Sequence, residues 1–321
     1  MILAGDLGGT KTNLGLFDVR DGKLALGASK RYASQKHSGL EEMAGDFLKE
    51  TKAKVSAASF GVAGPVVDNK VHGTNLPWGV DGAGMERLLG LPRVRLLNDL
   101  EAAAYGIGMM EPKDLEVLHA GVSVAGANRA VIAAGTGLGE GVLFWDGKQH
   151  LPMATEAGHS DFAPNTAKQA ELWQYLKSRY EFVSSEKILA GSGFQRVHEF
   201  LNPNVRHPGF DDKSAIDPAA EITKLGLAGE CPVCVATLDL WTEIYGSEAG
   251  NLALRSVALG GIYITGGIAV KILPKLRDGR FIAAIRHKEK LSDFLARIPV
   301  RVVLNEDCPL FGAGFVAWKG L

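Results

Sequence analysis

Two glycine-rich segments of similar pattern stand about 130 residues apart in this chain. Residues 1–18 read MILAGDLGGTKTNLGLFD, and residues 131–146 read VIAAGTGLGEGVLFWD. Each has an apolar run, a turn of glycines and small polar residues, and a second apolar run that ends at an aspartate. A hairpin turn needs only one or two glycines. We interpret the surplus as bare backbone whose N–H groups can approach an anion, so the two turns predict two lobes that grip one polyphosphate.

The first turn also carries side chains that suit a metal–phosphate pair. A carboxylate at Asp6, a hydroxyl at Thr10 and free amides around one turn are groups that hold Mg²⁺ and phosphate, with Asp6 holding the ion through water. The alternative is a plain hairpin whose aspartate accepts hydrogen bonds from the turn. The second turn adds the hydroxyl of Thr136. A third pair, Gly266-Gly267, follows a buried strand and indicates either a nucleoside contact or an ordinary tight turn.

Asn98 and Asp99 stand where an apolar strand ends and a helix begins. Ligands of open α/β sheets collect beyond the carboxyl ends of the strands. Asp99 is therefore a candidate general base for a hydroxyl nucleophile. The alternative is that Asp99 only caps the helix.

A second polar cluster, Glu156-Ala157-Gly158-His159, lies just after the second glycine-rich segment. A carboxylate and an imidazole on a flexible turn suit two adjacent hydroxyls of a polyol; a solvated loop and a zinc site are the alternatives. Glu186, in VSSEKI, either forms part of a capping box or points into a cleft between the two predicted lobes. For Cys231 and Cys234 a zinc site needs two more ligands and Cys308 supplies at most one, so packing at a helix start is the favoured interpretation.

Composition and charge bound the class of protein. The 321 residues fit two domains, and 46% hydrophobic with 22% charged residues is ordinary for a globular protein. A net charge of −1 argues against a nucleic-acid or anionic-membrane surface. No run of 18 apolar residues and no signal-peptide pattern occurs, which predicts a cytoplasmic protein without a membrane span. Three cysteines are too few for a disulfide framework.

The hydrophobic pattern predicts alternating strands and helices. After the first hairpin we expect a third strand. Counted from the first strand, the expected order of elements is βββαβαβα, and this order is partly repeated from residue 131. Long helical stretches are predicted over 167–200 and 235–256, and a last helix over 310–318. The alternation favours α/β domains with mixed sheets.

Together these segments closely resemble the bacterial glucokinases, which belong with actin, hexokinase and the heat-shock chaperone ATPases. The resemblance covers essentially the whole chain, because GDLGGTKTNLGL, FGVAGPV, TNLPW, LLNDLEAAAYG, GTGLGEG, EAGHSDFAP, VSSEKILAGSG, GNLAL and ITGGI occur in the family's order. It implies a two-lobed actin-like/ribonuclease H-like ATPase fold, with mixed central sheets, flanking helices and a cleft. A smaller α/β domain would comprise 1–109 plus about 300–321, and a larger one 110–299.

The resemblance further implies ATP-dependent phosphorylation of glucose at the 6-hydroxyl, a glycolytic step. The alternatives are a kinase for another hexose and a sugar-sensing ATP-binding protein of the same fold. Glucose and Mg²⁺·ATP are the expected partners, together with a second copy in a homodimer. A related branch carries a cysteine-rich zinc motif after its Glu-x-Gly-His segment; this chain has none, so it resembles the zinc-free glucokinase branch.

The same resemblance assigns the site residues. ATP would be bound by the two phosphate turns and the adenosine turn: Gly5, Asp6, Leu7, Gly8, Gly9, Thr10, Gly135, Thr136, Gly137, Gly266 and Gly267, with Asp6 also directed to Mg²⁺ through water. The sugar would be bound by Asn75, Asn98, Asp99, Glu156, His159 and Glu186, with Asp99 as the catalytic base.

Overall fold

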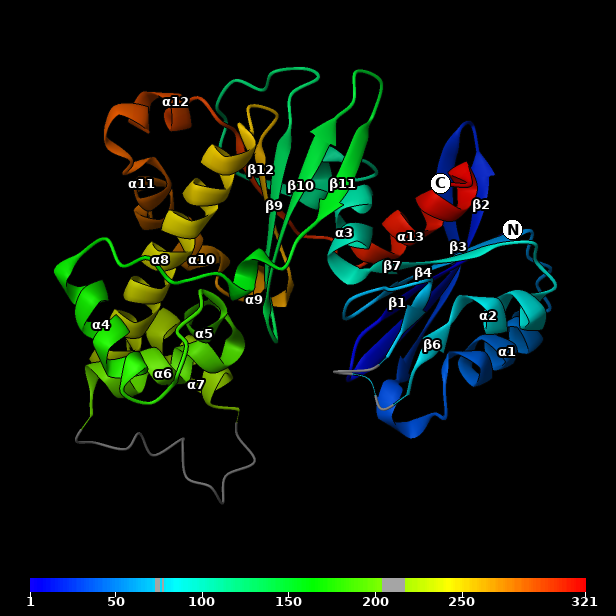
Figure 1. Ribbon diagram of the computed structural model, residues 1–321, viewed down its shortest axis with the longest axis horizontal. Helices are drawn as coiled ribbons and strands as arrows, with labels where there is room; N and C mark the ends of the chain where they lie inside the picture. The colour runs from blue at the N-terminus through cyan, green and yellow to red at the C-terminus, as the bar shows by residue number, and fades with distance from the viewer. Residues whose placement is uncertain (73–75, 77, 204–216) are drawn as a thin grey trace. The chain divides into compact units, whose positions relative to one another are not determined.

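The chain forms two compact units, each with a central sheet (Figure 1). The computed structural model describes residues 1–72, 76, 78–203 and 217–321, so Asn75 lies outside the described residues. Unit 1 comprises Met1–Asp114, His150–Ala154 and Asn305–Leu321. Unit 2 comprises Leu115–Gln149 and Thr155–Leu304.

Unit 1 is built on a five-stranded mixed sheet of order β3-β2-β1-β4-β7. Its strands are β1 (Ile2–Leu7), β2 (Lys11–Arg20), β3 (Lys23–Ala33), β4 (Ala57–Val62) and β7 (Val94–Asn98). β1 pairs with β2 antiparallel and with β4 in parallel, and β4 pairs with β7 in parallel. The predicted first hairpin and third strand are confirmed.

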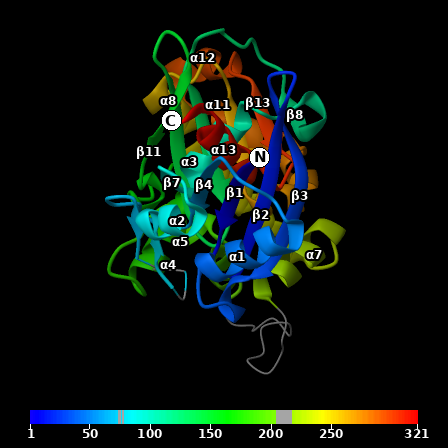
Figure 2. The same ribbon diagram turned by 90° about the vertical axis from the view of Figure 1, so that its right-hand side faces the viewer.

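Helices cover both faces of this sheet because its strands are apolar on both sides. Leu3 and Leu7 of β1 share a buried core with α1 and α2, whereas Ile2 and Ala4 share one with α13. Figure 1 shows α1 and α2 on one face and α3 and α13 on the other, and Figure 2 again shows α13 beside α3. The helices are α1 (Leu40–Thr51), α2 (Gly82–Leu89), α3 (Asp99–Ile107) and α13 (Cys308–Lys319); the short strands β5 (Lys70–Val71) and β6 (Val80–Asp81) pair separately, and two 3₁₀ turns span Ser34–Lys36 and Pro112–Asp114.

The second sheet repeats the strand order of the first and adds one strand, in the order β11-β10-β9-β12-β13-β8. Its strands are β8 (Leu115–His119), β9 (Arg129–Ala134), β10 (Leu138–Trp145), β11 (His150–Ala154), β12 (Ile262–Thr265) and β13 (Val300–Val303). β9 pairs antiparallel with β10 and parallel with β12, as β1 does with β2 and β4. The predicted partial repeat is therefore confirmed.

A 25-residue helix, α8 (Pro232–Ser256), runs through the core of unit 2. Trp241 and Tyr245 of this helix are fully buried and pack their rings against Phe194 and Phe281. The other helices are α4 (Ala167–Lys177), α5 (Glu186–Leu189), α6 (Gly191–Leu201), α7 (Pro218–Ala228), α9 (Gly267–Lys271), α10 (Leu273–Leu276), α11 (Arg280–Arg286) and α12 (Ser292–Ala296), with 3₁₀ turns at Ala157–His159 and Glu289–Leu291.

The long helical stretch predicted over about 167–200 is confirmed at its two ends by α4 and α6, but its continuity is wrong, because residues 178–185 are not helical. Between α4 and α5 the chain turns, and residues 183–185 then pair with residues 160–162, where Phe162 N donates to Val183 O at 3.0 Å. α5 and α6 pack so closely that a Cβ on Gly193 would lie 1.7 Å from Ile188 O. None of the helices in the described ranges is long and apolar enough to span a membrane.

Candidate active site

The first glycine turn joins β1 to β2, and hydrogen bonds from Ser34 hold it in place. Gly8 N donates to Lys11 O at 2.9 Å, which closes the turn. Ser34 Oγ donates to Gly8 O at 2.6 Å, and Ser34 N donates to Thr10 O at 3.1 Å. Thr10 itself is exposed. The turn is therefore held in one shape by its carbonyl groups while its outer side chain faces solvent.

Gly5 and Leu7 lie in β1 rather than in this turn. Gly5 is paired with Leu14 on one side and Phe60 on the other, and a Cβ on it would lie 2.5 Å from Phe60 Cδ1. Leu7 is fully buried in the unit 1 core. Packing therefore explains both residues, and their predicted contacts with ATP stay untested.

Carboxylates gather beside the first turn in unit 1. Burial, followed by the charges of Asp99 and Asp307, raises the pKa of Asp6 to about 7, although Arg31 opposes the shift. Asp307 was missed by the sequence analysis. It stands in the polar run Asn305-Glu306-Asp307 that follows β13, which is the signal that would have found it. Asn13 Nδ2 donates to Asp307 Oδ1 at 3.3 Å and orients that carboxylate.

Asn98, not Asp99, is the N-cap of α3. Its Oδ1 accepts from Leu100 N at 2.9 Å and from Glu101 N at 3.4 Å, while its Nδ2 donates to Gly64 O at 3.1 Å. Asp99 is the first residue of α3, and its Oδ1 also accepts from Leu100 N at 2.9 Å. Capping therefore does not need Asp99, whose carboxylate acts on Asp6 through its charge.

In unit 2, Glu186 supports the second glycine turn. Gly135 N donates to Gly137 O at 2.9 Å across this turn. Glu186 Oε2 accepts from Leu138 N at 3.0 Å, and a Cβ on Gly137 would lie 2.5 Å from that same oxygen. Glu186 begins α5 without a side-chain cap, so the capping-box alternative is wrong. A side chain at position 137 would therefore displace this carboxylate.

His159 lies beside Glu186, on the 3₁₀ turn Ala157–His159. Its Nδ1 is 3.8 Å from Glu186 Oε1, and about 61% of its side chain is exposed. Ser185 N donates to Ser160 O at 3.0 Å, which joins the two segments. Glu156 stands at the start of the 3₁₀ turn and is exposed. Unit 2 thus brings the glycine turn, Glu186 and the Glu156–His159 segment together.

Gly266 lies against the end of β9, next to the second glycine turn. Its φ is +88°, and a Cβ would lie 2.5 Å from Ala134 O, so a side chain there meets both backbone strain and a clash. At Gly267 a Cβ would meet nothing within 4 Å. A tight turn therefore explains the glycine at position 266. At Gly267 the space beside the backbone is open, so a ligand can approach the backbone there.

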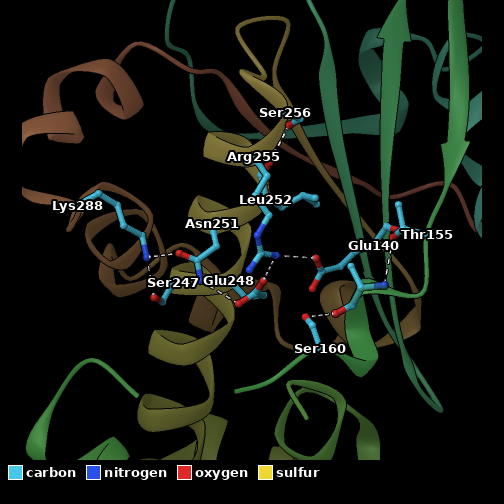
Figure 3. A network of polar contacts seen from close by, with 11 residues as sticks. Glu140, Thr155, Ser160, Ser247, Glu248, Asn251, Leu252, Arg255, Ser256 and Lys288 are labelled. Atoms are coloured by element: carbon cyan, nitrogen blue, oxygen red, sulfur yellow. Dashed lines mark hydrogen bonds and ion pairs between the residues drawn. The ribbon is translucent and has the colours of Figure 1, made fainter. Parts of the chain in front are cut away.

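A polar network between β10 and α8 contains a buried carboxylate, Glu140 of β10 (Figure 3). Arg255 Nη1 lies 3.8 Å from Glu140 Oε2 and 2.9 Å from Glu248 Oε1. Burial, and then the charge of Glu248, raise the pKa of Glu140 to about 8 against the effect of Arg255. The backbone of Glu140 also serves the site: Thr155 Oγ1 donates to Glu140 O at 2.7 Å and accepts from Ala157 N at 3.2 Å.

We expect replacement of Glu140 by glutamine to stabilise the protein more at alkaline than at acidic pH. The folded pKa of about 8 exceeds the ordinary 4.5. The contribution of Glu140 to stability is therefore greatest below pH 4.5, falls as the pH rises between those values, and is lost above about 8. The charged groups that face it are Glu248 and Arg255, with the Tyr245 hydroxyl nearby. Urea unfolding at pH 5 and pH 9 measures this; an equal effect at both pH values contradicts it, and exposed Asp146→Asn is the control.

Comparison with known proteins decides the family. A family model described as "Glucokinase" matches residues 3–319. The chain belongs to the glucokinase family. A glucokinase of Nostoc sp. is 36% identical over 340 residues, covering 99% of this chain and 98% of the relative. A glucokinase of Synechocystis sp. is 33% identical, with 98% and 97% covered.

Solved structures show the glucokinase fold. A glucokinase from an Antarctic psychrotroph aligns with a TM-score of 0.89 at 28% identity, covering 99% of this chain and 98% of its own. A ROK family glucokinase from Streptomyces griseus, solved with glucose and AMPPNP, aligns at 0.68 with 20% identity and 99% of both chains. A ROK family transcriptional regulator also aligns at 0.69, with 14% identity, 99% of this chain and 77% of its own. Because regulators share this fold, function must be argued from residues.

Proposed function

We propose that this chain phosphorylates glucose at its 6-hydroxyl with ATP as donor, giving glucose 6-phosphate and ADP. The observation that carries the proposal is the arrangement of Glu186 and His159 directly beside the second glycine turn. A carboxylate and an imidazole there suit neighbouring hydroxyls of a sugar, and the turn suits phosphate. Membership of the glucokinase family supports both assignments.

In unit 1 we assign the proton transfer to Asp99. Its carboxylate would accept the proton of the 6-hydroxyl as that oxygen attacks the γ-phosphorus. Asp6 and Asp307 fit a nearby magnesium ion, because both are oxygen donors whose charges act on one another. When bound, Mg²⁺ neutralises charge on the phosphates. The proposal has Asp6 hold it through water, while Gly8, Gly9 and Thr10 turn backbone N–H groups toward phosphate.

In unit 2 we assign phosphate binding to Gly135, Thr136 and Gly137 and sugar binding to Glu156, His159 and Glu186. Glu186 links the two tasks, since one of its oxygens holds the turn at Leu138 N and the other faces His159. The backbone at Gly266 and Gly267 would contact adenosine. Asn98 and Asn75 complete the proposed set of sugar-binding residues. Both polar atoms of the Asn98 side chain, Oδ1 and Nδ2, form hydrogen bonds within unit 1.

The proposal extends to domain and assembly. The proposed smaller domain comprises residues 1–109 with about 300–321 and the larger one 110–299; the compact units differ from these bounds at residues 110–114, 150–154 and about 300–304. The packing of α13 on α3, β1 and β4 supports the return of the C-terminal segment to the first domain. We also propose a homodimer, which sedimentation velocity tests.

A sugar-sensing protein of the same fold is the second candidate, because a transcriptional regulator also has this fold. A sensor binds sugar without consuming ATP. Incubation with Mg²⁺·ATP and a panel of hexoses, followed by ³¹P NMR, separates the two. A glucose 6-phosphate signal supports the kinase, whereas unchanged ATP with measurable sugar binding supports the sensor.

We expect Glu156→Ala and His159→Ala each to lower kcat/KM for glucose by roughly 10- to 150-fold. The reason is that a hydroxyl contact to a charged group is worth about 1.5–3 kcal/mol. Steady-state kinetics and nucleotide titration measure the effect, and ATP affinity should change little. Exposed Glu181→Ala is the control. Loss of nucleotide affinity alone would move these residues out of the sugar site.

A further inference from the structure

One histidine and two cysteines meet where α6, α7 and α8 of unit 2 pack together. His198 comes from α6, and Cys231 and Cys234 from the start of α8. One potential ligand atom from each residue lies within 4.8 Å of the other two. No other group of three such ligands was found among residues 1–72, 76, 78–203 and 217–321. None of these three side chains has a part in the proposed sugar or ATP chemistry.

His198 stands on the buried face of α6, at a position where an amphipathic helix usually has an apolar residue. Phe194, Val197 and His198 stand at i, i+3 and i+4 on the buried face of α6, and only about 1% of His198 is exposed. Neutral imidazole is a common metal ligand.

The two cysteines stand at the first turn of α8, and their sulfurs lie within 4.8 Å of each other. Cys231 is the N-cap of α8, and its Sγ accepts from Cys234 N at 3.5 Å. Cys234 is fully buried, while Cys231 is partly exposed. Both thiols are free. Burial raises the pKa of the Cys234 thiol to about 12, so metal binding has to displace its proton.

We propose that His198, Cys231 and Cys234 bind one Zn²⁺ ion, with water in the fourth position. Two sulfurs and one imidazole nitrogen are donors that zinc prefers, whereas Mg²⁺ and Ca²⁺ need oxygen. Bonds of about 2.3 Å to sulfur and 2.0 Å to nitrogen put tetrahedral ligand atoms about 3.5–3.8 Å apart. The ligand atoms lie within 4.8 Å of one another, so binding needs side-chain shifts of at most about 1 Å. Both thiols release their protons to solvent on binding.

This site differs from the cysteine-rich motif that the sequence analysis found absent. That motif follows the Glu-x-Gly-His segment directly, whereas His198 and the cysteines stand farther along the chain and come from separate helices. The ion would connect α6 to the first turn of α8. Since α6 follows α5, which begins with Glu186, the connection supports the helix pair behind the second glycine turn.

Cys231→Ser is the sharpest test, because serine is a favoured N-cap and keeps the start of α8 while removing one sulfur. Zinc content of purified full-length protein is measured by mass spectrometry, and affinity by competition with a chromophoric chelator. We expect about one zinc per wild-type chain and at least roughly 100-fold weaker binding by Cys231→Ser, more than loss of an outer-sphere partner costs. Cys308→Ser is the matched control: it removes the third cysteine, lies in unit 1 and should leave the zinc content unchanged.

Cobalt provides a second measurement on the unaltered chain. Co²⁺ added to chelator-treated wild-type protein should give thiolate-to-metal charge-transfer absorption and the visible bands of tetrahedral coordination, and both should be lost in Cys231→Ser. A chelator should also lower the Tm of wild type but not of Cys231→Ser. Wild-type protein that binds no zinc, zinc that stays equally tight in Cys231→Ser, or a disulfide between Cys231 and Cys234 would each overturn the proposal.

Discussion

Replacement of Asp99 by asparagine is expected to lower kcat by roughly 10²–10⁴-fold while the affinity for sugar changes far less. Asparagine keeps the size of the side chain and its ability to accept a hydrogen bond from Leu100 N, but it cannot take the proton of the attacking hydroxyl. Because Asn98 already caps α3, the helix should begin at the same residue in the variant. Pre-steady-state and steady-state rates with glucose and Mg²⁺·ATP measure the loss.

Asp81→Asn is the matched control for this prediction. Asp81 is the N-cap of α2, where its Oδ1 accepts from Ala83 N at 3.2 Å, and asparagine caps a helix equally well. The control should keep its turnover. Near-normal turnover in Asp99→Asn would remove Asp99 from the reaction and leave it a structural role at the start of α3.

The strand order could be predicted from the sequence because the signals were local. Apolar runs joined by glycine turns identified both hairpins, and the pattern predicted that the order of elements along the chain is partly repeated from residue 131; the order of the strands within each sheet comes from the structure. The predicted continuity of the helical stretch over about 167–200 was wrong because tertiary contacts decided there. Residues 183–185 pair with residues 160–162, and α6 packs tightly against the end of α5, neither of which a helical pattern reveals.

The sequence predicted those candidate residues that stand in short polar motifs next to glycine turns or strand ends. Glu186, His159 and the second glycine turn come together as a polar set, and Asp99 stands close enough to affect Asp6. Gly5 was read as part of a phosphate turn, but the neighbouring Phe60 ring explains it. The sequence analysis missed Asp307 and His198 because their neighbours are far away in the sequence. Only the fold brings Asp307 close to Asp6 and His198 close to Cys231 and Cys234.

ATP hydrolysis without sugar is expected to be orders of magnitude slower than phosphoryl transfer to glucose. Water is smaller than a hexose and always present, so a kinase that keeps its catalytic groups ready would waste ATP. Under the proposed mechanism the contacts of the sugar hydroxyls with Glu156, His159 and Glu186 supply binding energy that assembles the catalytic groups. Water makes none of these contacts and therefore leaves the groups unassembled.

The most direct measurement is the rate of ADP formation by the full-length protein with Mg²⁺·ATP, with and without glucose, while glucose 6-phosphate is quantified in the same samples. The account predicts that ADP forms rapidly only with glucose, in a one-to-one ratio to glucose 6-phosphate. Wild-type protein that releases ADP at a comparable rate without sugar, or that forms ADP without glucose 6-phosphate, would contradict it.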